Sequence, residues 1–244
     1  MTHQPFRLVN AAADAPYIFI CDHASNVVPT ELRGLGIAPA ELTRHIAWDI
    51  GAGDIAEILA RRFDAPAVIC GTSRLVIDCN RHPAYPTSIP EISDQTRIPG
   101  NLDLTSADRT ERIARYFAPY HDAVDLMIER KLAAGQAPTV LSIHSMTPAI
   151  GGVARPWQIA ISWHEDRRLS DPMLAALRRN TGINVGDNQP YALDPAEDYS
   201  VPVHAMRRGL KHIQVEFRQD LVATPAGVAE WARIFGDALV AATA

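Results

Sequence analysis

The sequence predicts an α/β fold, a single domain over residues 1–244 with a mixed, mostly parallel central sheet flanked by helices. Two observations support this prediction. Short apolar runs alternate along the chain with segments whose apolar residues recur at helical spacing. In addition, no internal repeat or low-complexity linker divides the 244 residues, and the hydrophobic fraction of 47% is enough for a substantial core.

The short apolar runs are the predicted strands. They are YIFIC at 17–21, AVIC and RLVID within 67–78, TVLSI at 139–143, WQIAISW at 157–163 and HIQVEF at 212–217. Nearly continuous apolar runs of this length are typical of strands that are covered on both faces.

Four longer segments are predicted to be helices from the spacing of their apolar residues, at 54–63, 106–134, 170–180 and 224–242. Pro119 lies inside the second segment, so a kink or break is expected there. Ser170 or Asp171 is expected to cap the third helix, and Thr224 to cap the fourth, with Pro225 at its first position. Residues 80–105 and 184–206 lack periodicity, and loops this long are usually functional.

Composition excludes several classes of partner. The formal charge is −5, the pI is about 6.0 and no basic run exceeds two residues, which argues against nucleic acid or an anionic membrane. The first residues do not resemble a signal peptide and no apolar stretch is long enough to span a bilayer, so we expect a cytoplasmic protein. Cys21, Cys70 and Cys79 form an odd, widely spaced set and are expected to be buried free thiols.

Polar residues follow the apolar runs at the points where the predicted strands end. His23 and Asn26 follow YIFIC, and His144 and Ser145 follow TVLSI; the others are Asn80 and Arg81 after RLVID, and Glu216 near the end of HIQVEF. Ligands of open α/β sheets bind outside the carboxyl ends of the strands. These side chains are therefore predicted to meet in one site.

Two of these residues, His23 and His144, are natural ligands for Zn²⁺, and a catalytic zinc takes three protein ligands and keeps an open position. The third ligand is open. Asn26 has the spacing after His23 that a carboxylate would have in an H-x-x-E pair, whereas Asp49 is a charged alternative on another segment and is preferred. Asp22 is a further alternative, although neighbouring side chains on a strand point to opposite faces.

Charged residues near this centre suggest hydrolysis of an anionic substrate. Glu216 lies in an otherwise apolar run, where an unpaired carboxylate is costly, and beside a metal it would act as a general base. Arg81 and Arg74 offer planar guanidinium groups for a substrate carboxylate. Arg74 is also placed to pair with Asp78 or Glu216.

Taken in order, six segments resemble the N-formylglutamate amidohydrolase family: CDHASN, HIAWDIGAGD, SRLVIDCNRHP, PYHDAV, LSIHSM and VEFRQDL. The resemblance runs from about Tyr17 to Leu221. It implies a fold similar to those of zinc carboxypeptidases and aspartoacylase. It also implies zinc ligation by His23 and His144, and substrate-carboxylate binding by Asn80 and Arg81.

In the same resemblance Glu216 matches the family's catalytic base, and Asn26 stands where the relatives have a metal-binding glutamate. The implied reaction is metal-dependent hydrolysis of the formyl amide of N-formyl-L-glutamate, or of a close N-acyl amino acid, to formate and the free amino acid. Ser145 is a further expected substrate contact. Two alternatives stay open: an aspartoacylase-like deacylase or short-peptide carboxypeptidase, and a non-catalytic small-molecule binder without its metal.

Overall fold

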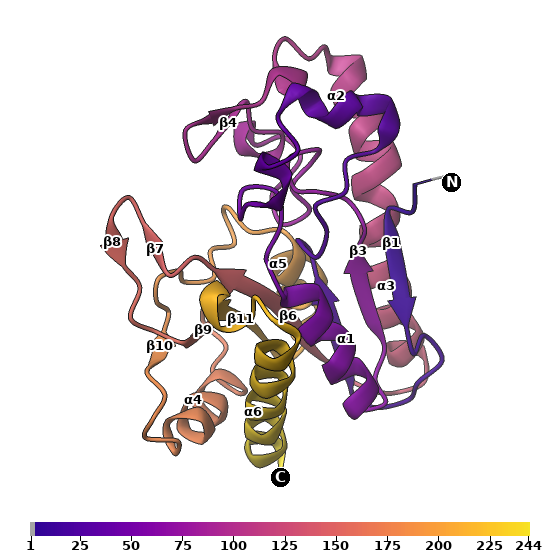
Figure 1. The fold of residues 1–244 in the computed structure, drawn as a ribbon. Coiled ribbons are helices and arrows are strands. Elements are labelled where there is room, and N and C mark those ends of the chain that lie inside the picture. Colours follow the sequence, from indigo (N-terminus) through magenta and orange to yellow (C-terminus); the bar gives the residue numbers. More distant parts are fainter. Residues whose placement is uncertain (1–2) are drawn as a thin grey trace.

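A seven-stranded mixed sheet forms the centre of the protein in a computed structural model that describes residues 3–244 (Figure 1). Its strand order is β1-β3-β2-β6-β11-β9-β10. The strands are β1 (Phe6–Val9), β2 (Tyr17–Cys21), β3 (Ala67–Cys70), β6 (Thr139–Met146), β9 (Ile159–Ser162), β10 (Val185–Asp187) and β11 (His212–Arg218). The four central strands β3, β2, β6 and β11 run parallel, whereas β1 and β9 pair antiparallel with β3 and β11. The predicted α/β class and mostly parallel sheet are confirmed.

Helices cover both faces of this sheet (Figure 1). One face packs against α1 (Ala52–Arg62), α4 (Ser170–Arg178) and α6 (Pro225–Thr243), and the other against α3 (Ala118–Ala133) and α5 (Ser200–His204). Side chains of β2 alternate between these two cores, since Phe19 lies in the first and Ile18 and Ile20 in the second. Because the central strands are buried on both sides, their sequences read as continuous apolar runs.

One predicted strand is wrong. RLVID, at 74–78, forms turns rather than a strand, although Leu75, Val76 and Ile77 are buried. Its hydrogen bonds are local or go to a loop: the Val76 amide donates to Ser73 O at 2.9 Å and the Asp78 amide to Ser88 O at 2.7 Å. This segment is apolar because it is buried, although it is not a strand. A short apolar run does not show whether its backbone pairs with a sheet.

The expected break at Pro119 is confirmed. After α2 (Ser106–Arg112), residues Ile113–Phe117 form a π-helical turn, and α3 begins at Ala118 with Pro119 in its first turn. The Ala118 amide donates to Ile113 O, five residues back. Proline has no amide hydrogen to continue the regular α pattern, so the helix changes its hydrogen bonding just before it.

The predicted cap of α4 is wrong. Leu169 occupies the N-cap position and makes no side-chain cap bond, and Ser170 is already the first helical residue. A residue inside the first turn cannot take the N-cap conformation, from which a side chain reaches the amides of the second and third helical residues. Among the described residues, the buried Ser170 hydroxyl has no hydrogen-bond partner.

Several short elements were not predicted. They are β1, β10, α5 and two hairpins, β4 (Ile92–Ser93) with β5 (Thr96–Arg97) and β7 (Ala149–Ile150) with β8 (Val153–Ala154). Two of them, β10 and α5, lie within the expected loop 184–206, and the β4–β5 hairpin lies within 80–105. No helix in residues 3–244 combines the length and apolarity needed to cross a bilayer.

Thr224 caps α6 as predicted, with its hydroxyl accepting from the Gly227 amide at 3.2 Å and Pro225 in the first turn. We expect Thr224→Ala to lower the free energy of unfolding by about 1 kcal/mol, because one amide at the helix start loses its partner. Urea denaturation measures the change. Thr181→Ala, at an exposed turn residue, is the matched control. Equal stability of the two variants would contradict the cap.

Candidate active site

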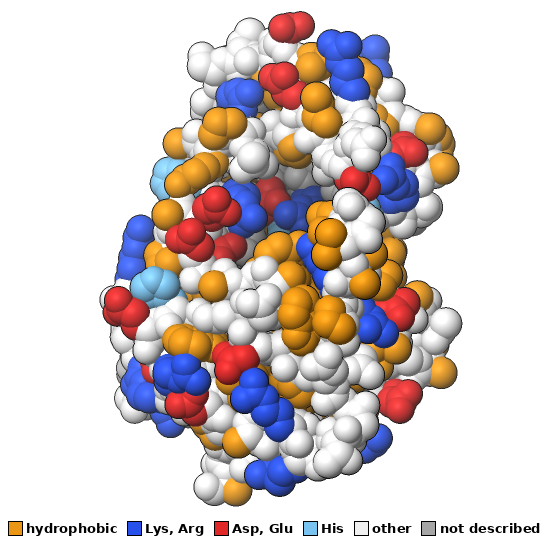
Figure 2. Space-filling model, turned by 90° about the vertical axis from the view of Figure 1, so that its left-hand side faces the viewer, with side chains coloured by type: hydrophobic (Ala, Val, Ile, Leu, Met, Phe, Trp, Pro, Cys, Tyr) orange, Lys and Arg blue, Asp and Glu red, His pale blue; other side chains and the backbone are white. Residues whose placement is uncertain are grey.

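The candidate site lies at the carboxyl ends of the central parallel strands. His23 comes two residues after β2, His144 lies near the end of β6, and Glu216 lies in β11 directly opposite His144 in the strand register. Asp49 comes from the segment before α1, and its amide donates to His23 O at 2.8 Å. All four side chains line a cavity of about 220 Å³. Figure 2 shows the hollowed face, with charged side chains gathered in the hollow and hydrophobic ones at its rim.

His23, Asp49 and His144 form a compact buried cluster whose ligand atoms lie within 4.8 Å of one another. Asp49 Oδ2 lies 2.9 Å from His144 Nδ1 and 3.3 Å from His23 Nδ1. Two imidazoles and one carboxylate are a donor set that suits a catalytic zinc, and the cavity beside them leaves room for a further ligand. The residues present therefore fit a metal of this kind.

The far nitrogen of each histidine ring faces a second carboxylate. His23 Nε2 lies 2.7 Å from Asp78 Oδ1, and His144 Nε2 lies 3.2 Å from Asp22 Oδ2. Asp22 Oδ1 also accepts from the hydroxyls of Tyr120 and Ser200, at 2.7 and 2.6 Å. Ligating histidines usually donate their other ring hydrogen to a carboxylate in this way. Both Nδ1 atoms are thereby left facing Asp49.

The charges in the cluster stabilise one another. Burial by itself lowers the pKa of His144, but hydrogen bonds with Asp22 and Asp49 raise that pKa well above the ordinary value. Burial likewise raises the pKa of Asp49, yet the nearby His23 and His144 hold it below its usual range. Because cations balance its charge, Asp49 is ionised in the buried site.

Glu216 has a different environment. Burial raises its pKa from 4.5 to about 7, in spite of the nearby His144. The only hydrogen bond of its carboxylate among the described residues is a long one, 3.5 Å, from Gln214 Nε2 to Oε1. A carboxylate whose pKa lies near neutrality can both take up and release a proton there, so Glu216 has the properties of a general acid–base group.

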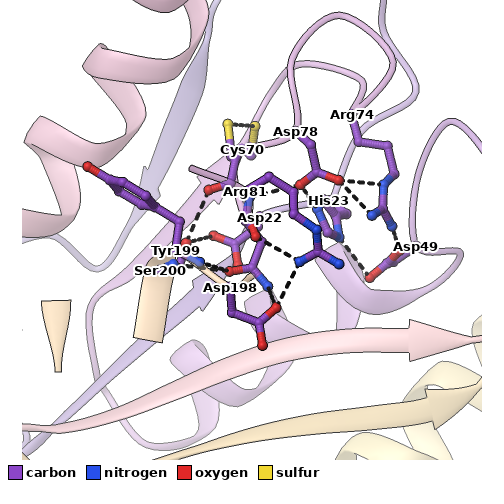
Figure 3. Close-up of polar contacts among 12 residues, drawn as sticks. Asp22, His23, Asp49, Cys70, Arg74, Asp78, Arg81, Asp198, Tyr199 and Ser200 are labelled. Atoms are coloured by element: carbon purple, nitrogen blue, oxygen red, sulfur yellow. Dashed lines mark hydrogen bonds and ion pairs between the residues drawn. The ribbon is translucent and has the colours of Figure 1, made fainter. Parts of the chain in front are cut away.

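The two predicted arginines are held by carboxylates (Figure 3). Arg74 donates to Asp78 Oδ2 from Nε at 3.1 Å and from Nη2 at 2.6 Å, and its Nη1 lies 3.4 Å from Asp49 Oδ1. Arg81 donates to Asp198 at 2.8 Å. Arg74 thus pairs with Asp78, one of the partners considered from the sequence, and both guanidinium groups line the cavity.

Asn80 and Ser145 also line the cavity, but their side chains are largely engaged. Asn80 Nδ2 donates to Asp198 at 3.1 Å, and its Oδ1 accepts from the amides of Tyr199 and Ser200. The Ser145 hydroxyl donates to Ile50 O at 2.8 Å, while its amide donates to Asp49 Oδ2 at 3.3 Å. Both residues therefore help to shape the site.

Asn26 lies apart from the cluster. Its side-chain nitrogen donates to Leu42 O at 2.9 Å, and Asn26 is not among the residues that line the cavity. The structure thus brings together His23, Asp49 and His144. Asp22 instead faces the far nitrogen of His144, and the Asn26 side chain binds a backbone carbonyl. Asp49 is 26 residues from His23, so only the tertiary fold shows that it can take the place beside the two histidines.

Sequence reasoning missed several cavity residues. Arg155, Gln214 and Gln219 line it from the interior, and Tyr191 and Glu197 lie at its exposed parts. Gln214 could have been found, because it lies two residues before Glu216 on the same strand and therefore on the same face. Arg155 follows a hairpin that the sequence did not predict, and it carried no recognisable motif.

A buried carboxylate with a pKa of about 7 lies beside a histidine–aspartate cluster on an α/β sheet, an arrangement typical of hydrolases. The family comparison makes this specific: the sequence model of N-formylglutamate amidohydrolase matches residues 15–223. The chain belongs to the N-formylglutamate amidohydrolase family and is a hydrolase that acts on an amide bond. This confirms the resemblance seen in the six sequence segments.

Two solved structures share the fold of this chain. A gene product of Agrobacterium tumefaciens is 36% identical, with a TM-score of 0.93 over 98% of this chain and 94% of that one. The N-formylglutamate amidohydrolase of Ralstonia eutropha JMP134 shares the fold, with a TM-score of 0.71, 21% identity and coverage of 98% and 97%. A search of curated proteins gave no match.

Proposed function

We propose that this protein hydrolyses the formyl–nitrogen amide of N-formyl-L-glutamate, giving formate and L-glutamate, with a divalent metal held by His23, Asp49 and His144. The observation that carries the proposal is Glu216, a buried carboxylate with a pKa of about 7 that shares a cavity with this cluster. Family membership supports amide hydrolysis, and the cationic side chains in the cavity support an anionic N-acyl amino acid as substrate.

A zinc ion, when bound, supplies polarisation of the acyl carbonyl and a lowered pKa for the attacking water. The chain's own residues do the rest. Glu216 accepts the proton of the attacking water and then donates it to the nitrogen as the amide bond breaks. Arg81 and Arg74 bind carboxylate of the substrate, and Asp78 and Asp22 hold the two histidine rings in place.

The experiment is a substrate panel. Purified protein loaded with zinc is incubated with N-formyl-L-glutamate, N-acetyl-L-glutamate, N-acetyl-L-aspartate and a short γ-glutamyl peptide, and free amine is measured. We expect the formyl compound to have the highest kcat/KM. Faster cleavage of an acetyl compound or of the peptide would replace this proposal by the deacylase or carboxypeptidase alternative. Binding without hydrolysis of any of them would indicate a binding protein.

The raised pKa of Glu216 also predicts a stability effect. The folded protein holds this proton more tightly than the unfolded chain, so the contribution to stability is full below pH 4.5 and is lost as the pH rises to about 7. We expect Glu216→Gln to stabilise the metal-free protein at about pH 8 by up to about 3 kcal/mol, at about 1.4 kcal/mol per pKa unit. Near pH 4 the variant should equal the wild type.

Urea denaturation at the two pH values measures this change. Glu230→Gln, at an exposed position of α6, is the matched control and should shift stability at neither pH. A Glu216→Gln protein that is no more stable than the wild type at the higher pH would show that the buried carboxylate is ionised without cost.

A further inference from the structure

Arg155 is a buried cation that lines the cavity beside neutral partners. Arg155 is only 6% exposed to solvent. Nη1 donates to the Thr147 hydroxyl at 3.1 Å, Nη2 donates to the Tyr191 hydroxyl, and the guanidinium lies 4.9 Å from the centre of the Tyr191 ring. Within residues 3–244, no carboxylate oxygen lies at ion-pair distance, 4.0 Å or less, from Arg155. A buried charge without a counterion is costly.

The other two cavity arginines differ from Arg155 in this respect. Arg74 is paired with Asp78 and Asp49, and Arg81 with Asp198 (Figure 3). An anionic ligand would have to compete with these internal carboxylates. At Arg155 the ligand would instead supply the missing counterion. Its guanidinium is therefore the cavity cation with the most to gain from a bound carboxylate.

Arg155 also lies on the opposite side of the centre from Arg74 and Arg81. Those two follow β3, whereas Arg155 precedes β9, and its carbonyl accepts from Nη1 of Arg218, the last residue of β11. In the strand order, β2, β6 and β11 lie between β3 and β9. His144 and Glu216 lie in β6 and β11, and His23 follows β2. Cations thus flank the candidate centre on both sides.

We propose that Arg155 determines specificity by binding the side-chain carboxylate of an N-acyl dicarboxylic amino acid, while the α-carboxylate lies on the side of Arg81. This inference rests on the proposed function and deepens it, because it explains why the substrate should carry two carboxylates. The uncharged amide of a glutamine side chain would leave Arg155 without its counterion. The site should therefore reject N-formyl-L-glutamine.

The test compares kcat/KM for N-formyl-L-glutamate and N-formyl-L-glutamine in zinc-loaded protein. We expect the wild type to favour the glutamate compound by about 100-fold or more, and Arg155→Met to reduce this preference to below about 10-fold. In Arg155→Met, kcat/KM should fall for the glutamate compound, and kcat/KM for the glutamine compound should change by less than about fivefold. Arg155→Lys, which keeps the charge, should retain an intermediate preference. Arg179→Met, at an exposed arginine of another surface, should leave the ratio unchanged.

An equal loss on both substrates in Arg155→Met would overturn the proposal, because it would place Arg155 at the α-carboxylate or in a purely structural role. If Arg155→Met does not fold, judged by circular dichroism, Arg155→Lys decides, and an unchanged ratio in that variant overturns the proposal.

If the wild type hydrolyses no N-formyl amino acid, the proposed function fails separately and binding becomes the readout. Calorimetric titration with L-glutamate and L-glutamine should then show that Arg155→Met weakens binding of glutamate alone. Equal affinities for glutamate in the two proteins, or no binding to the wild type, would overturn the role of Arg155.

Discussion

Replacing Glu216 by glutamine is expected to lower kcat of the zinc-loaded protein for N-formyl-L-glutamate by about 100-fold to 10,000-fold, the usual range for loss of a general acid–base group. Glutamine has nearly the shape of glutamate but can neither accept the water's proton nor deliver it to the leaving nitrogen. KM and bound zinc should stay close to the wild-type values, because Glu216 is not one of the clustered ligands. Steady-state kinetics and metal analysis of the same preparation measure all three quantities.

The pH dependence of activity is a second test of Glu216→Gln. Wild-type kcat/KM, which reports the free enzyme, should rise with pH as Glu216 ionises, with a midpoint at or below about 7, since a bound cation lowers its pKa. The residual activity of Glu216→Gln should lack this limb. Glu230→Gln is the control and should keep both rate and profile. A Glu216→Gln enzyme with wild-type kcat would remove Glu216 from the chemistry.

Replacing Asp49 by asparagine is expected to abolish stable zinc binding and, with it, nearly all amidase activity. The variant loses the charged oxygen that lies between His23 and His144, while its size is unchanged. Loss of one of three protein ligands should lower metal affinity more than the 10-fold to 100-fold typical of an outer-partner mutation. Zinc per chain after dialysis, measured by atomic spectroscopy, checks this, with calorimetric titration for the affinity.

Asn26→Ala is the matched comparison for Asp49→Asn. Asn26 donates to Leu42 O and lies outside the cavity lining, so its loss should leave the zinc content at the wild-type level and cost at most some local stability. Zinc retained by Asp49→Asn but lost from Asn26→Ala would reverse the assignment of the third ligand. Zinc retained by both variants would show that neither residue is needed for the metal.

Much of the fold could be predicted from the chain because local patterns carry it. Strands such as β2 and β11 are covered on both faces, so they read as apolar runs. The cap and proline of α6 and the proline of α3 mark where these helices begin. Several short elements could not be predicted, because they carry no local pattern. The strand β10 has three residues, too few to show a period, and the buried turn at 74–78 is apolar through burial without strand pairing.

The sequence by itself determined the chemical inventory of the site: two histidines, a carboxylate within an apolar strand and an Asn-Arg pair, each at the end of an apolar run. Their order along the chain also identified the family. Only the tertiary structure decided which side chains share a cavity, because Asp49 and Arg155 belong to segments without a periodic signal. The histidine of CDHASN enters the cluster while its asparagine turns to a backbone carbonyl. Packing sets the distances between segments that are remote in the sequence, and local sequence patterns do not predict these distances.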